Sequence, residues 1–223
     1  MTAGVGAALL ALAVGAGLDL ASVVQGLLSR PLIVSALAGG VVGDLEGALR
    51  VGAVLELFAL DVVPVGAARY PDFGAATVAA VLYAAGAPWQ ETLGPAVGLG
   101  LVLAIVGGAS IPVARRWNAR VVASFAERLA AGDARAVDHV HLRCLLHDLI
   151  RSVGVAVAFL AIGVGARELA LYPPAGVGPW LVAVALGGGL WAAVHGAVDA
   201  AGAGSRGRWL AGGLAVGVLA ALA

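Results

Sequence analysis

The chain has 223 residues, of which 61% are hydrophobic and only 12% charged, and its mean hydropathy is +1.01. A soluble domain usually carries about 25% charged residues, so this composition excludes an ordinary soluble protein and predicts an integral membrane protein. The formal net charge of zero argues against a nucleic-acid partner. The single cysteine, Cys144, excludes an intrachain disulfide and a multi-cysteine metal site.

Apolar segments recur along the whole chain. The first, residues 2–18, has no cationic start and no convincing A-x-A-like cleavage site, so we interpret it as an uncleaved membrane segment. The clearest full span is 93–113, which we expect to end at Ser110 and Pro112. Further apolar segments are 73–87, 152–171, 180–198 and 209–223. The sequence predicts one all-α, polytopic membrane domain over 1–223, with about six to eight crossing or dipping segments.

Most of the charge expected at membrane depth lies in residues 30–74. Ionisable groups in a membrane are costly and normally face a cavity or a partner, so this stretch is the predicted functional site. Its two apolar runs, 31–43 and 48–63, flank the motif GDLEG and are short for a span. They predict a re-entrant hairpin, which is tolerated only where protein or a water-filled cavity covers it. Such discontinuous segments often build transporter binding sites. The charged residues are Asp44, Glu46, Arg50, Glu56, Asp61, Arg69 and Asp72.

Glu56 is the carboxylate with the most apolar surroundings, residues 51–60. A buried carboxylate must be protonated, paired or hydrogen-bonded. A sugar hydroxyl donates well to a carboxylate, so Glu56 is a candidate sugar ligand; the alternative is a structural ion pair inside the membrane. Arg30, which precedes the proline that opens the next segment, can snorkel or pair with a carboxylate. Asp61 is either a second ligand or a helix-end charge, and we favour the helix-end charge.

Loop 64–72 follows directly and is rigid at its two prolines and flexible at Gly66. Asp72 ends this loop. It can be aimed at the site, or it can cap the helix that we expect to begin near Phe73, and one carboxylate can do both. Gly66 and Asp72 therefore join Glu56 and Asp61 as candidate substrate-binding residues.

Residues 114–151 form the extended polar region, and their arginine excess places them in the cytoplasm by the positive-inside rule. The run RVVASFAERLAA predicts an amphipathic helix, broken at Gly132-Asp133, that packs at the interface or docks a cytoplasmic partner. Three histidines, His139, His141 and His147, lack the i, i+4 spacing of a zinc helix, so we predict no metal site. The arginines counted are Arg115, Arg116, Arg120, Arg128, Arg135, Arg143 and Arg151. The expected layout is thus an N-terminal membrane part (1–113) with the sugar site, a cytoplasmic amphipathic connector (114–151) and C-terminal membrane segments (152–223).

Four blocks of the sequence carry a family resemblance. They are RPLI from Arg30, GD at Gly43-Asp44, VGAVLELFAL around Glu56, and PVGAARYPD ending at Asp72. With weaker similarity through HVHLRCLLHDLIRSVGVAV, the chain resembles, over about two thirds of its length, the IIC subunit of the mannose/fructose/sorbose family of the bacterial sugar phosphotransferase system.

The resemblance implies a permease subunit of the bacterial cytoplasmic membrane that works with a IID membrane subunit and soluble IIA and IIB proteins. In that family the IIC subunit itself carries no phosphoryl group and no cofactor. It presents a hexose-like sugar to phosphorylated IIB by an elevator-like displacement. Acidic and glutamine residues often precede the RPL block near the sugar path, which points to Gln25 more than to Asp19. Pro64 stands where mannose-type members commonly have a polar residue, often an amide, so mannose itself is not implied.

Two other functions remain open from the sequence. A diverged homologue could act as a regulatory or assembly subunit without transporting sugar. An ion-coupled small-solute transporter could use Glu56 or Asp61 as its proton carrier. Because short re-entrant segments leave backbone that neighbouring protein must cover, we also expect an obligate oligomer, most simply with IID.

Overall fold

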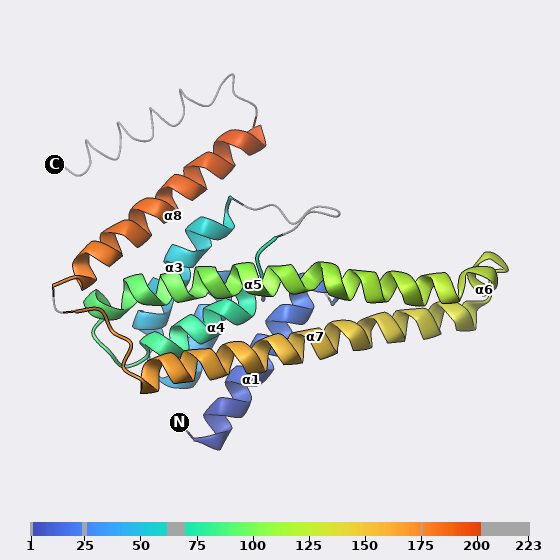
Figure 1. Cartoon of the computed structure of the whole chain (residues 1–223), viewed down its shortest axis with the longest axis horizontal. Helices are drawn as coiled ribbons and strands as arrows, with labels where there is room; N and C mark the ends of the chain where they lie inside the picture. Colours follow the sequence, from blue (N-terminus) through green and yellow to red (C-terminus); the bar gives the residue numbers. More distant parts are fainter. Residues whose placement is uncertain (1, 24–25, 62–69, 175, 202–223) are drawn as a thin grey trace.

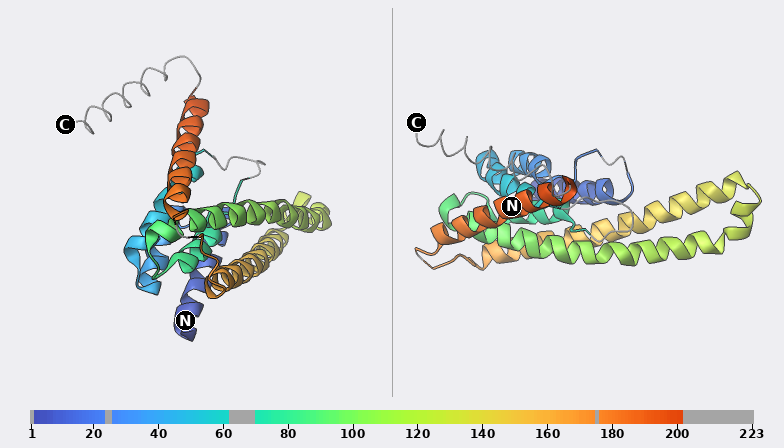
Figure 2. Two further views of the ribbon diagram at one scale, coloured as in Figure 1. Left: turned by 60° about the vertical axis from the view of Figure 1, so that its left-hand side comes forward. Right: turned by 90° about the horizontal axis from the view of Figure 1, so that it is seen from above.

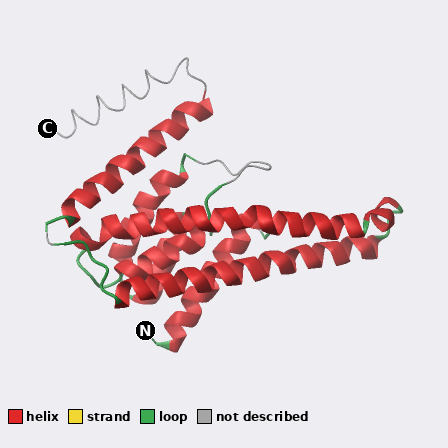
Figure 3. Ribbon diagram, viewed as in Figure 1, coloured by secondary structure: helices red, strands yellow, loops and turns green. Residues whose placement is uncertain are grey.

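The structure is a computed structural model that describes residues 2–23, 26–61, 70–174 and 176–201. Every regular element in the described residues is a helix (Figures 1 and 3), which confirms the predicted all-α fold. The elements are α1 (Ala3–Ala21), α2 (Pro31–Val42), α3 (Leu45–Ala59), α4 (Phe73–Ala84), α5 (Trp89–Ser124), α6 (Ala126–Ala130), α7 (Ala134–Glu168) and α8 (Gly178–Ala201).

Helices α2 and α3 form the short hairpin that the sequence predicts. Pro31 occupies the first turn of α2, and Gly43, at φ 79°, ends it in the left-handed conformation that glycine adopts readily. Asp44 then caps α3 by accepting a hydrogen bond from the Gly47 amide. With 12 and 15 residues, the helices are about 18 and 22 Å long, too short to cross a hydrocarbon core of about 30 Å.

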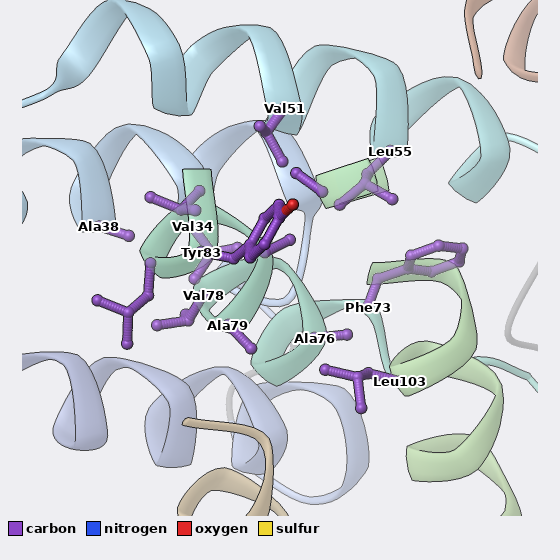
Figure 4. Close-up of a cluster of buried hydrophobic side chains, with 14 of the residues drawn as sticks. Val34, Ala38, Val51, Leu55, Phe73, Ala76, Val78, Ala79, Tyr83 and Leu103 are labelled. Atoms are coloured by element: carbon purple, nitrogen blue, oxygen red, sulfur yellow. The ribbon is translucent and has the colours of Figure 1, made fainter. Parts of the chain in front are cut away.

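Helix α4 lies at the centre of the molecule, and all twelve of its residues are buried. It contacts α1, α2, α3, α5 and α7. Figure 4 shows the surrounding cluster, with side chains of α2, α3 and α5 converging on α4. Close approach depends on small residues: a side chain at Gly163 of α7 would meet the Ala79 carbonyl oxygen at 2.7 Å. A helix that is apolar on every face is typical of such a fully buried position.

Helices α5 and α7 are longer than any membrane span requires. They contain 36 and 35 residues, so they are about 54 and 52 Å long. Their inner halves pack with α1–α4 to form what we call the body. Their outer halves leave the body side by side and meet at α6 (Figures 1 and 2). We call residues 115–147 the arm; Ala136 is the one buried residue within it.

The apolar span at 93–113 is confirmed within α5, but its expected end at Ser110 and Pro112 is wrong. Pro112 lacks an amide proton, so it removes one helical hydrogen bond without stopping the helix. The helix instead continues to Ser124 and breaks at Phe125. The expected break at Gly132-Asp133 is confirmed as well, because Gly132 has φ 75° and Asp133 caps α7. The run RVVASFAERLAA is therefore divided between the end of α5 and α6, not one interfacial helix.

Four helices of the described residues, α1, α5, α7 and α8, are long and apolar enough to cross a membrane. Together with the short hairpin, they confirm a polytopic membrane protein. Helix α8 packs on α3 and α5, yet it exposes large apolar side chains, including Trp180 and Trp191. The predicted segment 209–223 lies outside the described residues.

Candidate functional site

The loops on which the sequence placed the candidate site meet at one end of the body. Leu20 at the end of α1, Arg30 and Pro31 at the start of α2, and Tyr70 and Pro71 before α4 line one small cavity of about 60 Å³. This cavity is smaller than the about 300–1,000 Å³ that small-molecule sites usually measure. Two of the candidates, Gln25 and Gly66, lie outside the described residues, as does Pro64.

Glu56 lies near the C-terminal end of α3 and pairs with Arg30. Its second oxygen, Oε2, accepts a hydrogen bond from the Leu32 amide at 3.1 Å. Glu56 therefore sits against the N-terminus of α2, where the helix dipole favours negative charge. The side chains of Glu56 and Arg30 are 18% and 33% exposed. The pair is thus formed but still reachable from solvent.

Asp72 is much more deeply buried. Its side chain is 1% exposed, and that of its partner Arg151 is 4% exposed. Oδ2 of Asp72 accepts a hydrogen bond from Nη1 of Arg151 at 2.9 Å. The same guanidinium donates to Ser110 Oγ at 3.1 Å and to the Gly17 carbonyl at 3.1 Å. One arginine on α7 therefore ties together α1, α5 and the segment that enters α4.

The buried pair is incompletely satisfied. Oδ1 of Asp72, Nε of Arg151 and Oγ of the adjacent Ser152 are buried with no hydrogen-bond partner among the described residues. The predicted cap is not made through the side chain, because Asp72 accepts no side-chain cap hydrogen bond from α4. Its amide instead donates to the Ala104 carbonyl of α5 at 2.8 Å. The Asp72 carboxylate pairs with Arg151 instead of capping α4.

The sequence reasoning missed Arg151, because it counted this residue with the polar region 114–151. The usable signal was its position: it directly precedes the apolar segment 152–171, and a cation at membrane depth needs a partner. Only the structure identifies that partner, which lies 79 residues away. Arg151 should therefore be removed from the arginines that carry the topology argument.

Asp61 follows the end of α3 and contacts α8. Its Oδ1 lies 3.3 Å from Nδ1 of His195, with both side chains more than one third exposed. The contact agrees with the helix-end reading of Asp61. Glu56, Asp61 and Asp72 each have a separate basic partner, so among the described residues they do not converge on a common point.

Asp19, which the sequence ranked below Gln25, shapes the loop after α1. It is buried, and its two oxygens accept hydrogen bonds from the Gly26 and Ser29 amides at 2.5 and 2.8 Å. A carboxylate that satisfies two loop amides fixes the shape of that loop. Asp19 thereby holds the segment that leads into Arg30.

The sequence of this chain is similar to those of known proteins. The family model described as the PTS system sorbose-specific IIC component matches residues 5–194. The mannose-specific EIIC component of Escherichia coli K12 is 28% identical over 141 residues, which are 63% of this chain and 52% of that protein. The fructose permease IIC component of Bacillus subtilis is 28% identical over 144 residues, 64% and 53% of the two chains. The sorbose-specific EIIC component of Klebsiella pneumoniae is 31% identical over 119 residues, 52% and 43%. The matches thus span about half the length of these relatives.

Two solved structures share the fold. One, described as a membrane protein, has a TM-score of 0.79 at 22% identity and covers 100% of this chain and 94% of its own. The other, the mannose transporter ManYZ in complex with microcin E492, has a TM-score of 0.63 at 21% identity and covers 97% and 87%. With the match over residues 5–194 and four helices able to span a membrane, the chain is a multi-pass inner-membrane protein that belongs to the sorbose-specific IIC family of the phosphotransferase system.

Proposed function

We propose that this chain is the IIC permease subunit of a mannose-type phosphotransferase system. In this proposal it moves a hexose-like sugar across the bacterial inner membrane and presents it to phosphorylated IIB. The observation that carries the proposal is the family match over residues 5–194, which includes the hairpin and the charged loops of the candidate site. Phosphoryl transfer belongs to the soluble IIA and IIB proteins, so the subunit is a transporter and not an enzyme by itself.

The accessible Glu56–Arg30 pair is the part of the candidate site best suited to a sugar. A neutral sugar offers hydroxyl groups, which bind well to a carboxylate and a guanidinium held side by side. Because both side chains are partly exposed, a hydroxyl can replace one of their contacts without breaking the body. Asp72 is fully buried, so we assign it to holding the loop and not to direct sugar contact. Asp61 remains a proposed contributor, as do Gln25 and Gly66, which lie outside the described residues.

We further propose that the working unit is an oligomer with a IID subunit. Helix α8 exposes Trp180, Val184, Leu190 and Trp191, each by more than half of its surface. The hairpin α2–α3 does not cross a membrane, so its backbone ends need cover at membrane depth from neighbouring protein. A partner membrane subunit would cover both the exposed side chains of α8 and the ends of the hairpin. A stable, active monomer in mild detergent would argue against this proposal.

The test is sugar uptake by cells that lack their own mannose-type system and express this chain with IID, IIA and IIB. We expect accumulation of a phosphorylated hexose-like sugar that disappears when IIB is omitted and withstands a proton ionophore. Uptake that persists without the soluble proteins but collapses with the proton gradient would favour ion-coupled transport. A complex that assembles with IID and carries no tested sugar would favour the regulatory or assembly role.

A further inference from the structure

A groove of about 430 Å³ lies between the segment Tyr70-Pro71 and α5. Four of its lining residues, Ile105, Ala109, Pro112 and Arg116, follow one another at steps of four, three and four residues. This spacing puts them on a single face of the helix, with Tyr70 and Pro71 as the opposite wall. The groove therefore runs along α5 from an apolar end to a cationic end, and we call it the Arg116 groove.

The cationic end lies where the membrane ends. The apolar span of α5 finishes at residue 113, so Arg116 is about one turn beyond it. Exposed Trp117 follows immediately, as expected for an aromatic residue at the depth of the lipid headgroups. Ile105, which is 65% exposed, lies about three turns back within the hydrocarbon. The groove thus spans both acyl-chain depth and headgroup depth.

The cation at this end is available for a ligand. Arg116 is exposed, and its side chain makes no hydrogen bond or ion pair with the part of the chain that the structure describes. The neighbouring Arg115 reaches over the Tyr70 ring at 5.4 Å and donates to its hydroxyl at 3.2 Å. Arg116 is therefore the cation that lines this end of the groove, and its guanidinium group favours an anion.

From this geometry we propose that the Arg116 groove binds an anionic phospholipid. The lipid phosphate pairs with Arg116, and one acyl chain lies along Ile105, Ala109 and Pro112. Basic pockets beside membrane helices are typical binding sites for anionic headgroups. The lining offers few acceptors for a neutral sugar, since Tyr70 and Arg116 supply its only polar side chains among the described residues. A lipid seated here would contact Tyr70 and Pro71, directly before Asp72, without depending on the proposed sugar transport.

The experiment uses the full chain, co-purified with its membrane partner and depleted of lipid in detergent. An equimolar mixture of dioleoyl phosphatidylglycerol and dioleoyl phosphatidylcholine is added, and the lipids retained are counted by native mass spectrometry. One arginine near a headgroup should give about a fivefold preference for phosphatidylglycerol. Arg116→Gln should bring this preference close to one. Arg120→Gln is the matched control: it removes an exposed arginine one turn further along the arm, outside the groove, and should change the preference less than twofold.

A second variant tests the apolar end. Ala109→Trp fills the groove, so it should lower retention of both lipids while the elution volume and melting midpoint stay those of the wild type. Equal retention of the two lipids by the wild type, or an equal loss in the Arg120→Gln variant, would overturn the proposal. Displacement of the lipid by inorganic phosphate would instead assign the groove to a free anion. A groove that takes lipid only after the membrane partner is removed would be a protein interface.

Discussion

Helices α5 and α7 each run through two regions, the body and the arm, which hold charge in different ways. In the body, Arg151 reaches Asp72 across 79 residues of sequence, and both side chains are less than 5% exposed. In the arm, Arg128 pairs with Asp133 five residues away, with exposures of 53% and 33%. Water solvates the arm charges whether or not they pair, whereas a charge in the body depends on its partner. We therefore expect the same helices to tolerate substitution very differently along their length.

The largest effect should come from breaking the pair in the body. Arg151→Met leaves the Asp72 carboxylate buried without a cation, which typically costs about 3–5 kcal/mol. We expect a sharp fall in monodisperse yield and in the thermal midpoint in mild detergent. Arg128→Met is the matched change in the arm and should alter both measurements far less.

A double variant keeps this prediction testable if Arg151→Met does not fold. Adding Asp72→Asn removes the stranded charge, so part of the lost yield should return. If Arg151→Met is as stable as Arg128→Met, the buried pair does not hold the body together.

Glu56→Gln should have the next largest effect, and on binding more than on folding. A charge-assisted hydrogen bond contributes roughly 1.5–3 kcal/mol, so sugar affinity should fall by about one to two decades. Arg30 is 33% exposed and can turn to water, so membrane yield should stay near normal. Glu46→Gln, on the same helix but 80% exposed, is the control. Sugar binding and membrane yield are measured on one preparation. Unchanged binding of a confirmed substrate would remove Glu56 from the site, and an early loss of yield would assign it to a structural pair.

Local features of the body were predictable from sequence. Pro31, Gly43 and Asp44 mark the ends of α2 and α3 by backbone chemistry that needs no tertiary information. The i, i+4 pair of Glu46 and Arg50 was also predictable. The partners of Glu56, Asp61 and Asp72 were not, because three-dimensional packing selects them. From the sequence, Asp72 could cap α4 or face the site. It pairs with Arg151 instead, because α7 packs beside it.

The arm shows a different failure of sequence reasoning. Hydropathy changes near residue 114, so the sequence predicts a span followed by a separate connector. The backbone does not change there: α5 continues through Pro112 and Arg116 to Ser124. Hydropathy reports whether a helix faces lipid or water. The hydrogen bonds within one helix form in either environment, so a change of hydropathy need not end the helix.

A smaller effect concerns the tip of the arm and its pH dependence. The hydrogen bond from Arg128 holds the pKa of Asp133 below its ordinary value, and Asp133 also caps α7 through the Arg135 and Ala136 amides. Because this pKa is lower in the folded than in the unfolded state, ionised Asp133 stabilises the tip at pH values above its unfolded pKa of about 3.9. That stabilisation is lost as the pH falls through the folded pKa. Hydrogen exchange at the start of α7, corrected for intrinsic rates, should therefore quicken in acid. Asp133→Asn keeps a capping oxygen but no charge, so its exchange should lack this step. An identical acid step in that variant would assign the titration to another group.

The smallest perturbation tests on which side of the membrane the arm lies. Six arginines remain in the argument once Arg151 is assigned to the body, so the positive-inside rule still places the arm in the cytoplasm. Asn118 is a poor reporter position, because it hydrogen-bonds Asp148 and His147. Glu127 lies in α6, which has no buried residue, so Glu127→Cys in a Cys144→Ala background should leave the fold unchanged. A membrane-impermeant maleimide should fail to label it in intact cells and should label it after the membrane is opened. Efficient labelling of intact cells would place the arm outside and reverse the orientation of the body with it.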